Sequence, residues 1–180
     1  MTPDQEAQAV AEARNGSAAG FARLVADHQQ AVRAFLRRLS GSYTDADDLA
    51  QETFVTAWAR IGSFRETESL RAWLCGIAYR KWMTGRRGEA RRRAREVAHW
   101  HEESLTPAPP GDPGDRLDAM TLLRMLPSEQ RAVVALCLAA GMSHSEAAVA
   151  LNLPLGTVKT YLSRGRTRLL SMLGACDENA

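Results

Sequence analysis

One segment, Leu126 to Leu173, constrains the fold more than any other part of this chain, because it contains the signals of three consecutive helices. Pro127 opens a first helix with apolar residues at helical spacing, and Gly141 follows where a left-handed C-cap fits. Ser143 and Glu146 then have the spacing of a capping box, which starts a short second helix. A short helix, a turn and a longer helix form the pattern of a helix-turn-helix, so the segment predicts a DNA-binding unit.

The third helix of this segment is predicted to contact DNA. Asn152 to Pro154 end the second helix, and Thr157 is expected to cap the third. Its buried side is predicted to consist of Val158, Leu162, Gly165, Leu169 and Leu173. The other side has small hydroxyls that approach base edges and cations that bind guanine or phosphate: Lys159, Thr160, Ser163, Arg164, Arg166 and Arg168. A solvated basic helix is the alternative, but the order of the three helices favours a recognition helix.

Positive charge is concentrated in two places, although the net charge of the chain is only +2. Between Arg80 and Arg95 there are eight lysines and arginines and one glutamate, and the predicted recognition helix adds four cations. The rest of the chain is therefore acidic. Two basic surfaces on an acidic body predict two contacts with a polyanion, with a solvated basic helix as the alternative for Arg80 to Arg95.

The composition is that of a small globular protein, with 180 residues of which 45% are hydrophobic. No apolar run is long enough to span a membrane, and the N-terminal residues are too polar for a signal peptide, so a cytoplasmic location is expected. The three cysteines form no CxxC pair, which indicates no zinc site, and Cys75 and Cys137 are expected in the core. The histidines and glutamates of residues 99–103 are expected to be solvated rather than metal-bound. No cofactor is indicated.

A break in composition divides the chain. Residues 104–115 contain four of the seven prolines and no helical periodicity, which is typical of a linker. Upstream, helices are expected from Gln5 to Arg14, after Ser17, from about Thr44 and from about Ser69. No segment alternates as a strand does. The prediction is an all-α fold of two small helical domains, residues 1–98 and 118–174, with a linker at 99–117 and a tail at 175–180.

The helix expected from Thr44 has an acidic outer face. Leu49, Val55, Trp58 and Ile61 are expected to point inward, which leaves outside five acidic or amide side chains: Asp45, Asp47, Asp48, Gln51 and Glu52. Paired carboxylates could also form a hydrolytic or metal site. No histidine lies near them at ligand spacing, and an exposed helix face supplies no closed pocket, so a catalytic site is not predicted.

Two blocks of sequence resemble a known family. DADDLAQETFVTAWARIGSF at residues 45–64 and RAWLCGIAYRKWMTGRRGEARRR at 71–93 look like region two of extracytoplasmic-function (ECF) sigma factors, RpoE-like members of the sigma-70 family. LPSEQRAVVAL and GTVKTYLSRGRTRL resemble region four of the same family. The resemblance implies a bacterial sigma factor that confers promoter specificity on RNA polymerase and has no catalytic activity of its own.

The resemblance also implies roles and partners. Asp48, Gln51 and Glu52 match positions that grip the clamp helices of the largest polymerase subunit, and the flap is a second polymerase contact. The recognition helix would contact the minus-35 element. The residues expected to contact the single-stranded minus-10 element are Tyr79, Arg80, Lys81, Trp82, Arg86 and Arg87. An anti-sigma factor is a further expected partner.

The chain departs from the family within this segment. The family commonly has I-A-R-N followed by an aspartate, whereas this chain has Ile77-Ala78-Tyr79-Arg80 and then Thr84. The change from Asn to Arg puts the base preference at the minus-10 element in doubt. Two other classes remain open from the sequence: a dimeric helix-turn-helix regulator, and an adaptor that binds a protein partner through its acidic helix.

Overall fold

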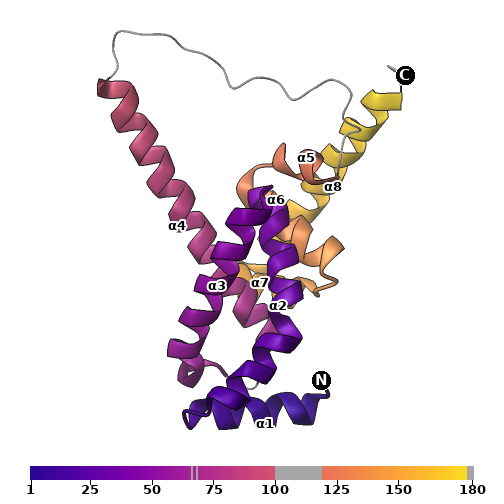
Figure 1. Cartoon of the computed structure of the whole chain (residues 1–180). Coiled ribbons are helices and arrows are strands. Elements are labelled where there is room, and N and C mark those ends of the chain that lie inside the picture. Colours follow the sequence, from indigo (N-terminus) through magenta and orange to yellow (C-terminus); the bar gives the residue numbers. More distant parts are fainter. Residues whose placement is uncertain (66, 68, 100–118, 178–180) are drawn as a thin grey trace.

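The computed structural model describes residues 1–65, 67, 69–99 and 119–177 (Figure 1). These residues contain helices and turns but no strand, which confirms the all-α prediction with two helical domains. The N-terminal unit comprises α1 (Pro3–Arg14), α2 (Ala18–Ser40), α3 (Tyr43–Arg60), a 3-10 turn (Ile61–Ser63) and α4 (Leu70–His99). The C-terminal unit comprises α5 (Ala119–Arg124), α6 (Ser128–Val134), a π-helical turn (Ala135–Ala139), α7 (His144–Leu151) and α8 (Leu155–Asp177).

Two predicted features fall partly or wholly outside the described residues. The predicted linker at 99–117 lies almost entirely within residues 100–118, and the histidine and glutamate cluster has only the backbone of His99 among the described residues. Within the described part of the chain, no helix is both long enough and apolar enough to cross a bilayer.

Local sequence signals set the helix ends of the N-terminal unit. At the start of α1, the Thr2 N–H donates to Gln5 Oε1 at 2.9 Å and the Gln5 N–H donates to Thr2 Oγ1 at 3.3 Å, a complete capping box. Gly41 ends α2 with a φ of +72°, a conformation that favours glycine. Ser42 Oγ then accepts the N–H of Asp45 at 3.2 Å and starts α3. These signals join α2 and α3 by a tight turn.

The core of the N-terminal unit lies between α2, α3 and α4. The inner side of α2 is buried through Leu24, Val32, Phe35, Leu36 and Leu39. From α4 the buried side chains include Leu70, Leu74, Cys75 and Ile77. Trp73 is only partly buried and lies against Phe64, with ring centroids 5.5 Å apart. Each fully buried Leu or Phe contributes about 1.5–3 kcal/mol relative to an exposed one.

The prediction for the inner side of α3 is wrong at two positions. Val55 is 71% exposed and Trp58 is 38% exposed, and Trp58 lies edge-on to Phe21 at the surface, with ring centroids 5.0 Å apart. The buried positions are Ala46, Ala50, Thr53, Phe54 and Ala57. Small residues on this side let α3 pack closely against α2, so the buried stripe follows the alanines rather than the largest apolar residues.

In the C-terminal unit, α6, α7 and α8 form the predicted helix-turn-helix. Gly141 has a φ of +65°, and the turn leads into a capping box in which Ser143 Oγ accepts the Glu146 N–H at 3.2 Å. Glu146 Oε2 accepts the Ser143 N–H at 2.9 Å. This hydrogen bond, with a second from the Ser143 hydroxyl, lowers the pKa of Glu146. Asn152 ends α7 in the left-handed region, with a φ of 52°.

The start of α8 differs from the prediction. The helix begins at Leu155, so Thr157 lies inside it and does not cap it. The Pro154 carbonyl accepts the N–H groups of Thr157 and Val158 at 2.9 and 3.1 Å, which starts the helix without a side-chain cap. Leu173, predicted on the buried stripe, is 47% exposed because the C-terminal part of α8 extends beyond the rest of the unit (Figure 1).

The two units lie against each other, with α7 beside α4, and with α5 and α6 beside α2. At Gly76 of α4 the helices approach so closely that a Cβ atom would lie 2.8 Å from the Ala150 carbonyl oxygen of α7. A second contact comes from Arg131 of α6, whose Nη1 donates to the Leu39 carbonyl at 2.7 Å. Both contacts join residues that are far apart in the sequence.

The described cysteine side chains are embedded in the protein. Cys75 is 1% exposed, and this burial raises its pKa to about 12. Cys137 is partly buried, and burial also raises its pKa. A thiol with a raised pKa forms little thiolate at neutral pH and reacts slowly, so these residues pack as small apolar groups.

Candidate nucleic-acid interface

The predicted recognition face of α8 points to solvent. All six predicted residues are exposed: Lys159, Thr160, Ser163, Arg164, Arg166 and Arg168. The Thr160 hydroxyl donates to the Gly156 carbonyl at 2.9 Å, so it lies along its own helix. Among the described residues, no carboxylate forms a salt bridge with any of these four cations. Their charges therefore remain available for phosphates or base acceptors.

Contacts with α6 hold this face in a fixed orientation. Val158 is fully buried, and a Cβ atom at Gly165 would lie 2.6 Å from Val134 Cγ2. The Tyr161 hydroxyl donates to Glu129 Oε2 of α6 at 2.9 Å. The cationic side of α8 is thus presented from a rigid support, as a recognition helix requires.

The aromatic pair of α4, Tyr79 and Trp82, is buried. Tyr79 is 9% exposed and Trp82 is 4% exposed, with ring centroids 6.0 Å apart. The C-terminal unit lies next to both rings. The Arg131 guanidinium is 5.9 Å from the Trp82 centroid, and the Glu129 carboxylate adds to burial, the main cause, in raising the pKa of Tyr79. In this arrangement of the two units, neither ring is open to a base.

The cations around this pair differ in their surroundings. Arg80, Arg86 and Arg87 are exposed, and the Arg86 guanidinium lies 5.0 Å from the Trp82 centroid. Lys81 is half-buried, and its Nζ lies 3.2 Å from Glu52 Oε2. The arginines among residues 91–95 have no described side chains. The described cations thus form a basic edge on α4 that borders the acidic side of α3.

Arg80 lies in a groove with a second arginine. Arg60, Arg80, Lys81 and Thr84 line it together with the acidic Glu52, whose carboxylate pairs with Lys81. Partial burial and then the charge of Arg60 lower the pKa of Arg80, although a guanidinium stays protonated at neutral pH. The Thr84 hydroxyl donates to the Arg80 carbonyl at 2.9 Å. A site with two arginines side by side has the chemistry to hold an anionic group.

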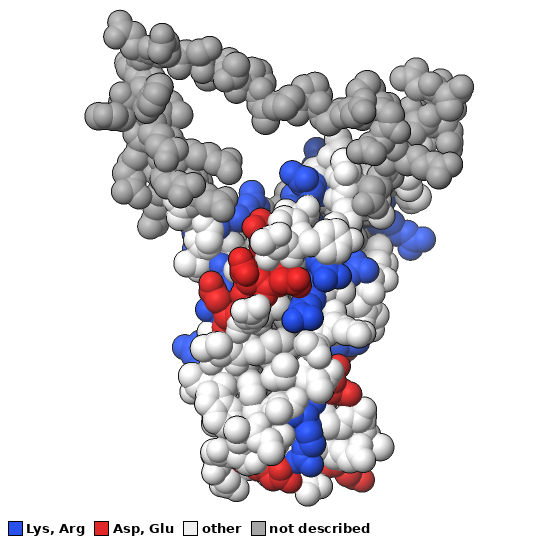
Figure 2. Space-filling model, viewed as in Figure 1, with Lys and Arg blue, Asp and Glu red and all other residues white. Residues whose placement is uncertain are grey.

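The predicted polymerase-binding residues share one surface. Asp48, Gln51 and Glu52 are exposed on α3, and Figure 2 shows acidic side chains gathered there beside lysines and arginines. These three residues line a shallow groove, and the exposed Val55 lines it with them. An apolar side chain with an acidic rim is typical of a protein interface. The sequence missed Val55 because its spacing suggested a buried position.

Asp47 does not belong to this surface. Its Oδ1 lies 3.5 Å from Arg33 Nε and 3.6 Å from Arg37 Nη2, both on α2. The predicted outer face is therefore narrower than expected, because Asp47 is used to join α3 to α2. Within the described residues, the one cluster with metal-ligand chemistry lies elsewhere, at Glu6, Asp27 and His28.

The sequence also missed Arg131, a buried cation between the units. It is 9% exposed and donates to three carbonyl oxygens, those of Leu39, Arg124 and Leu126. Burial, and then the charges of Arg86 and Arg124, lower its pKa. An arginine within the apolar run of α6 was the available signal, but nothing in the sequence identifies the carbonyl it reaches.

Family comparisons divide the chain as the structure does. The family model for Sigma-70 region 2 matches residues 24–92, and the model for Sigma-70 region 4 matches residues 116–169. The first range holds the acidic face and the aromatic pair, and the second holds the helix-turn-helix.

Individual relatives extend the likeness to most of the chain. The RNA polymerase sigma factor NccH of Alcaligenes xylosoxydans xylosoxydans is 30% identical over 96% of this chain and 97% of its own length. The ECF RNA polymerase sigma factor EcfG of Rhodopseudomonas palustris is 34% identical over 79% of this chain and 78% of its own.

Two solved structures have a similar fold. The sigma factor RpoE of Bartonella quintana, solved with the anti-sigma factor NepR, has a TM-score of 0.70 and 31% identity over 86% of this chain and 96% of its own. CnrH, solved with the cytosolic domain of CnrY, has a TM-score of 0.70 and 30% identity over 97% of this chain and 99% of its own.

Proposed function

Because the chain belongs to the sigma-70 family, and within it to the ECF sigma factors, we propose that it binds core RNA polymerase and directs it to promoters through two DNA contacts. The exposed cationic face of α8, which no described carboxylate neutralises, carries this proposal. The chain would supply promoter specificity in the cytoplasm and leave catalysis to the polymerase. The proposed domains are residues 1–98 and 118–174, as the sequence predicts.

A run-off transcription assay tests this function. Core polymerase alone should not initiate at the cognate promoter, and addition of this chain should produce a transcript of defined length. A helix-turn-helix repressor would bind promoter DNA without polymerase and produce no transcript. An adaptor would bind polymerase without conferring a promoter preference.

We propose that α8 contacts the minus-35 element, with Arg164 at a base and Arg168 at phosphate. Arg164→Ala should cost about 1–3 kcal/mol and relax specificity at one base pair. Arg168→Ala should weaken binding to all promoter sequences about equally. It should also lower the slope of log binding constant against log salt concentration by roughly one unit. Holoenzyme binding to promoter variants at several salt concentrations measures both. Equal effects of the two substitutions on every variant would contradict this division.

We propose that Arg80 holds a backbone phosphate of the melted strand. Arg60 lies beside it, and Lys81 is already paired with Glu52, so the groove favours an anion over a specific base edge. Arg80→Lys should leave transcription nearly unchanged, whereas Arg80→Asn should lower transcription from all promoters by a similar factor. A promoter library randomised across the melted element, with the exposed and distant Arg23→Asn as control, measures this. A changed sequence profile in the Arg80→Asn protein would instead assign Arg80 to a base.

We propose that an anti-sigma factor is a further partner. The support is that both solved relatives were obtained with a second protein, one of them named as an anti-sigma factor. Co-purification from the native cell tests this. The rings of Tyr79 and Trp82 can reach a base only after the C-terminal unit moves, so a protein that holds the two units together would keep this chain inactive.

A further inference from the structure

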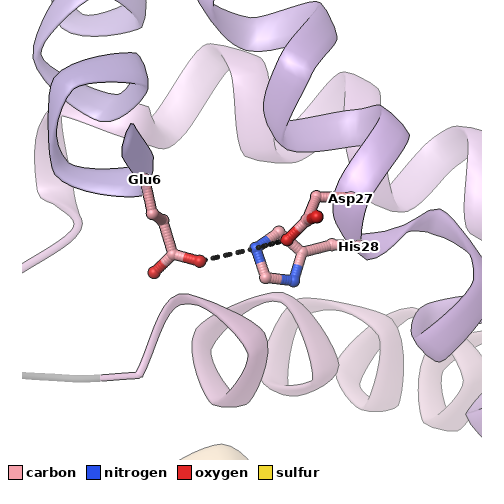
Figure 3. Close-up of side chains that lie close together, drawn as sticks. All are labelled: Glu6, Asp27 and His28. Atoms are coloured by element: carbon pink, nitrogen blue, oxygen red, sulfur yellow. Dashed lines mark hydrogen bonds and ion pairs between the residues drawn. The ribbon is translucent and has the colours of Figure 1, made fainter. Parts of the chain in front are cut away.

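Three side chains able to bind a metal ion meet where α1 crosses α2 (Figure 3). His28 Nε2 lies 2.9 Å from Glu6 Oε2 and 3.9 Å from Asp27 Oδ2. His28 is 7% exposed, whereas Asp27 is exposed and Glu6 is half-buried. The cluster thus has a buried nitrogen donor and two carboxylates that reach the surface.

The spacing of these atoms fits a small cation. Bonds of about 2.0–2.2 Å in a tetrahedral site place neighbouring donor atoms about 3.3 Å apart. The distances from His28 Nε2 to the two carboxylates, 2.9 and 3.9 Å, lie on either side of this value, and all three donor atoms lie within 4.8 Å of one another. Small rotations of the Glu6 and Asp27 side chains would bring both to bonding distance.

The polar contacts of the cluster leave one carboxylate oxygen near the ring without a hydrogen bond to it. An imidazole Nε2 carries at most one hydrogen, which Glu6 accepts, so the nearby Asp27 Oδ2 has no hydrogen bond to the ring. The α-ammonium group of Met1 donates to the other oxygen, Asp27 Oδ1, at 3.0 Å. With Oδ1 held in this way, Oδ2 is the oxygen that lies near His28, at 3.9 Å from its Nε2, as in carboxylates whose outer oxygen is hydrogen-bonded while the inner one binds a metal.

We propose that Glu6, Asp27 and His28 bind a divalent transition-metal ion of the zinc type, with water completing the coordination. Imidazole with carboxylate suits Zn²⁺ and its neighbours, whereas Ca²⁺ and Mg²⁺ prefer oxygen ligands alone. The two carboxylates offset the charge of the ion, although the Met1 ammonium group, 3.0 Å from Asp27 Oδ1, adds one positive charge beside them.

The site would join α1 to the rest of the N-terminal unit. Glu6 lies on α1, before the residues matched by the region 2 family model, and the other two ligands lie on α2 within that match. The bound ion is therefore a cross-link between α1 and the part of the chain that the region 2 family model matches. Its effect should be on the stability of this end of the molecule, which lies opposite α5 (Figure 1).

Titration of the full, tag-free chain with Zn²⁺, followed by calorimetry, and with Co²⁺, followed by visible absorption, tests the site. We expect one equivalent of each ion to bind, with Co²⁺ giving an absorption band typical of nitrogen and oxygen ligands. Zn²⁺ should also raise the melting temperature, because it binds the folded state. Glu6→Gln and His28→Asn should each weaken binding by about tenfold or more.

His144→Asn is the matched control, because His144 is exposed at the start of α7 and far from the cluster in the sequence. It should bind as the wild type does. The helix α1 packs in the core through Ala9, Val10 and Ala13, and this packing does not depend on the ion. The cluster variants should therefore fold, and their melting temperatures without metal check this. Equal Zn²⁺ binding by the wild type and His28→Asn proteins would show a hydrogen-bonded cluster only and overturn the proposal.

Discussion

Replacing both Asp48 and Glu52 with lysine is expected to abolish assembly with core polymerase while the chain stays folded. Both side chains are exposed on α3, so the exchange disturbs no core contact. Glu52 also neutralises Lys81, and the reversed residue would add to a basic edge that repels a basic partner surface. Like charges brought together at an interface cost several kcal/mol. Co-elution of the double variant with core polymerase on size exclusion measures the loss.

The control must change the net charge equally at another surface. Asp4→Lys with Glu12→Lys does this on α1, where the lost pair between Glu12 and Arg23 is exposed and contributes little. This variant should assemble as the wild type does. Normal assembly by the Asp48 and Glu52 double variant would rule out α3 as the docking surface.

Gly76→Ala is expected to separate the two units. The added Cβ would lie 2.8 Å from the Ala150 carbonyl oxygen. Because this oxygen belongs to the main chain, the clash can be relieved only if α4 and α7 move apart. Overpacking of this kind costs about 1–3 kcal/mol. The same substitution favours the helical state of α4 itself by about 1 kcal/mol, so the N-terminal unit should not be destabilised. Small-angle X-ray scattering should give a larger radius of gyration, and Gly76→Val a larger one still.

Gly85→Ala is the matched control for this prediction. Gly85 lies on the same helix, and nothing lies within 4 Å of a Cβ atom there, so it gains the same helix propensity without a clash. Its radius of gyration should equal that of the wild type. If the Gly76 variants scattered as the wild type does, the units would not depend on this contact.

The helix-turn-helix could be predicted from the sequence because its signals are local. Gly141, Ser143 and Glu146 act on their immediate neighbours, and the structure confirms the turn and the capping box. The sequence predicts the start of α8 three residues late, with Thr157 as the cap before Val158, whereas the helix begins at Leu155 and the Pro154 carbonyl accepts its first hydrogen bonds. Every residue has a main-chain carbonyl, so the residue types do not show which carbonyl accepts these hydrogen bonds.

The inner side of α3 shows a second limit. Apolar size at helical spacing favours Val55 and Trp58 as core residues, but a close helix contact selects alanines instead. The acidic residues Asp48 and Glu52 were placed correctly on the exposed side, since a charge is rarely buried unpaired. Asp47 is also at the surface, with a side chain that is 44% exposed, but the sequence does not indicate that it pairs with two arginines of another helix.

Residues between the two units could not be found at all from the sequence. Gly76 looks like any helical glycine, and Arg131 like any surface cation, until a second unit is placed beside them. Contacts between residues more than seventy positions apart have no periodicity or spacing that a sequence displays.

Two of the contacts between the units, Gly76 with Ala150 and Arg131 with Leu39, both end on a carbonyl oxygen of the main chain. Every amino acid has that oxygen, so no side-chain replacement at 39 or 150 removes the acceptor or makes room for a larger residue at 76. An interface usually changes in sequence through paired substitutions, in which one compensates for the other. Such pairs have little scope at these two contacts. At these two contacts, evolution can adjust the packing of the units only by changing Gly76 or Arg131.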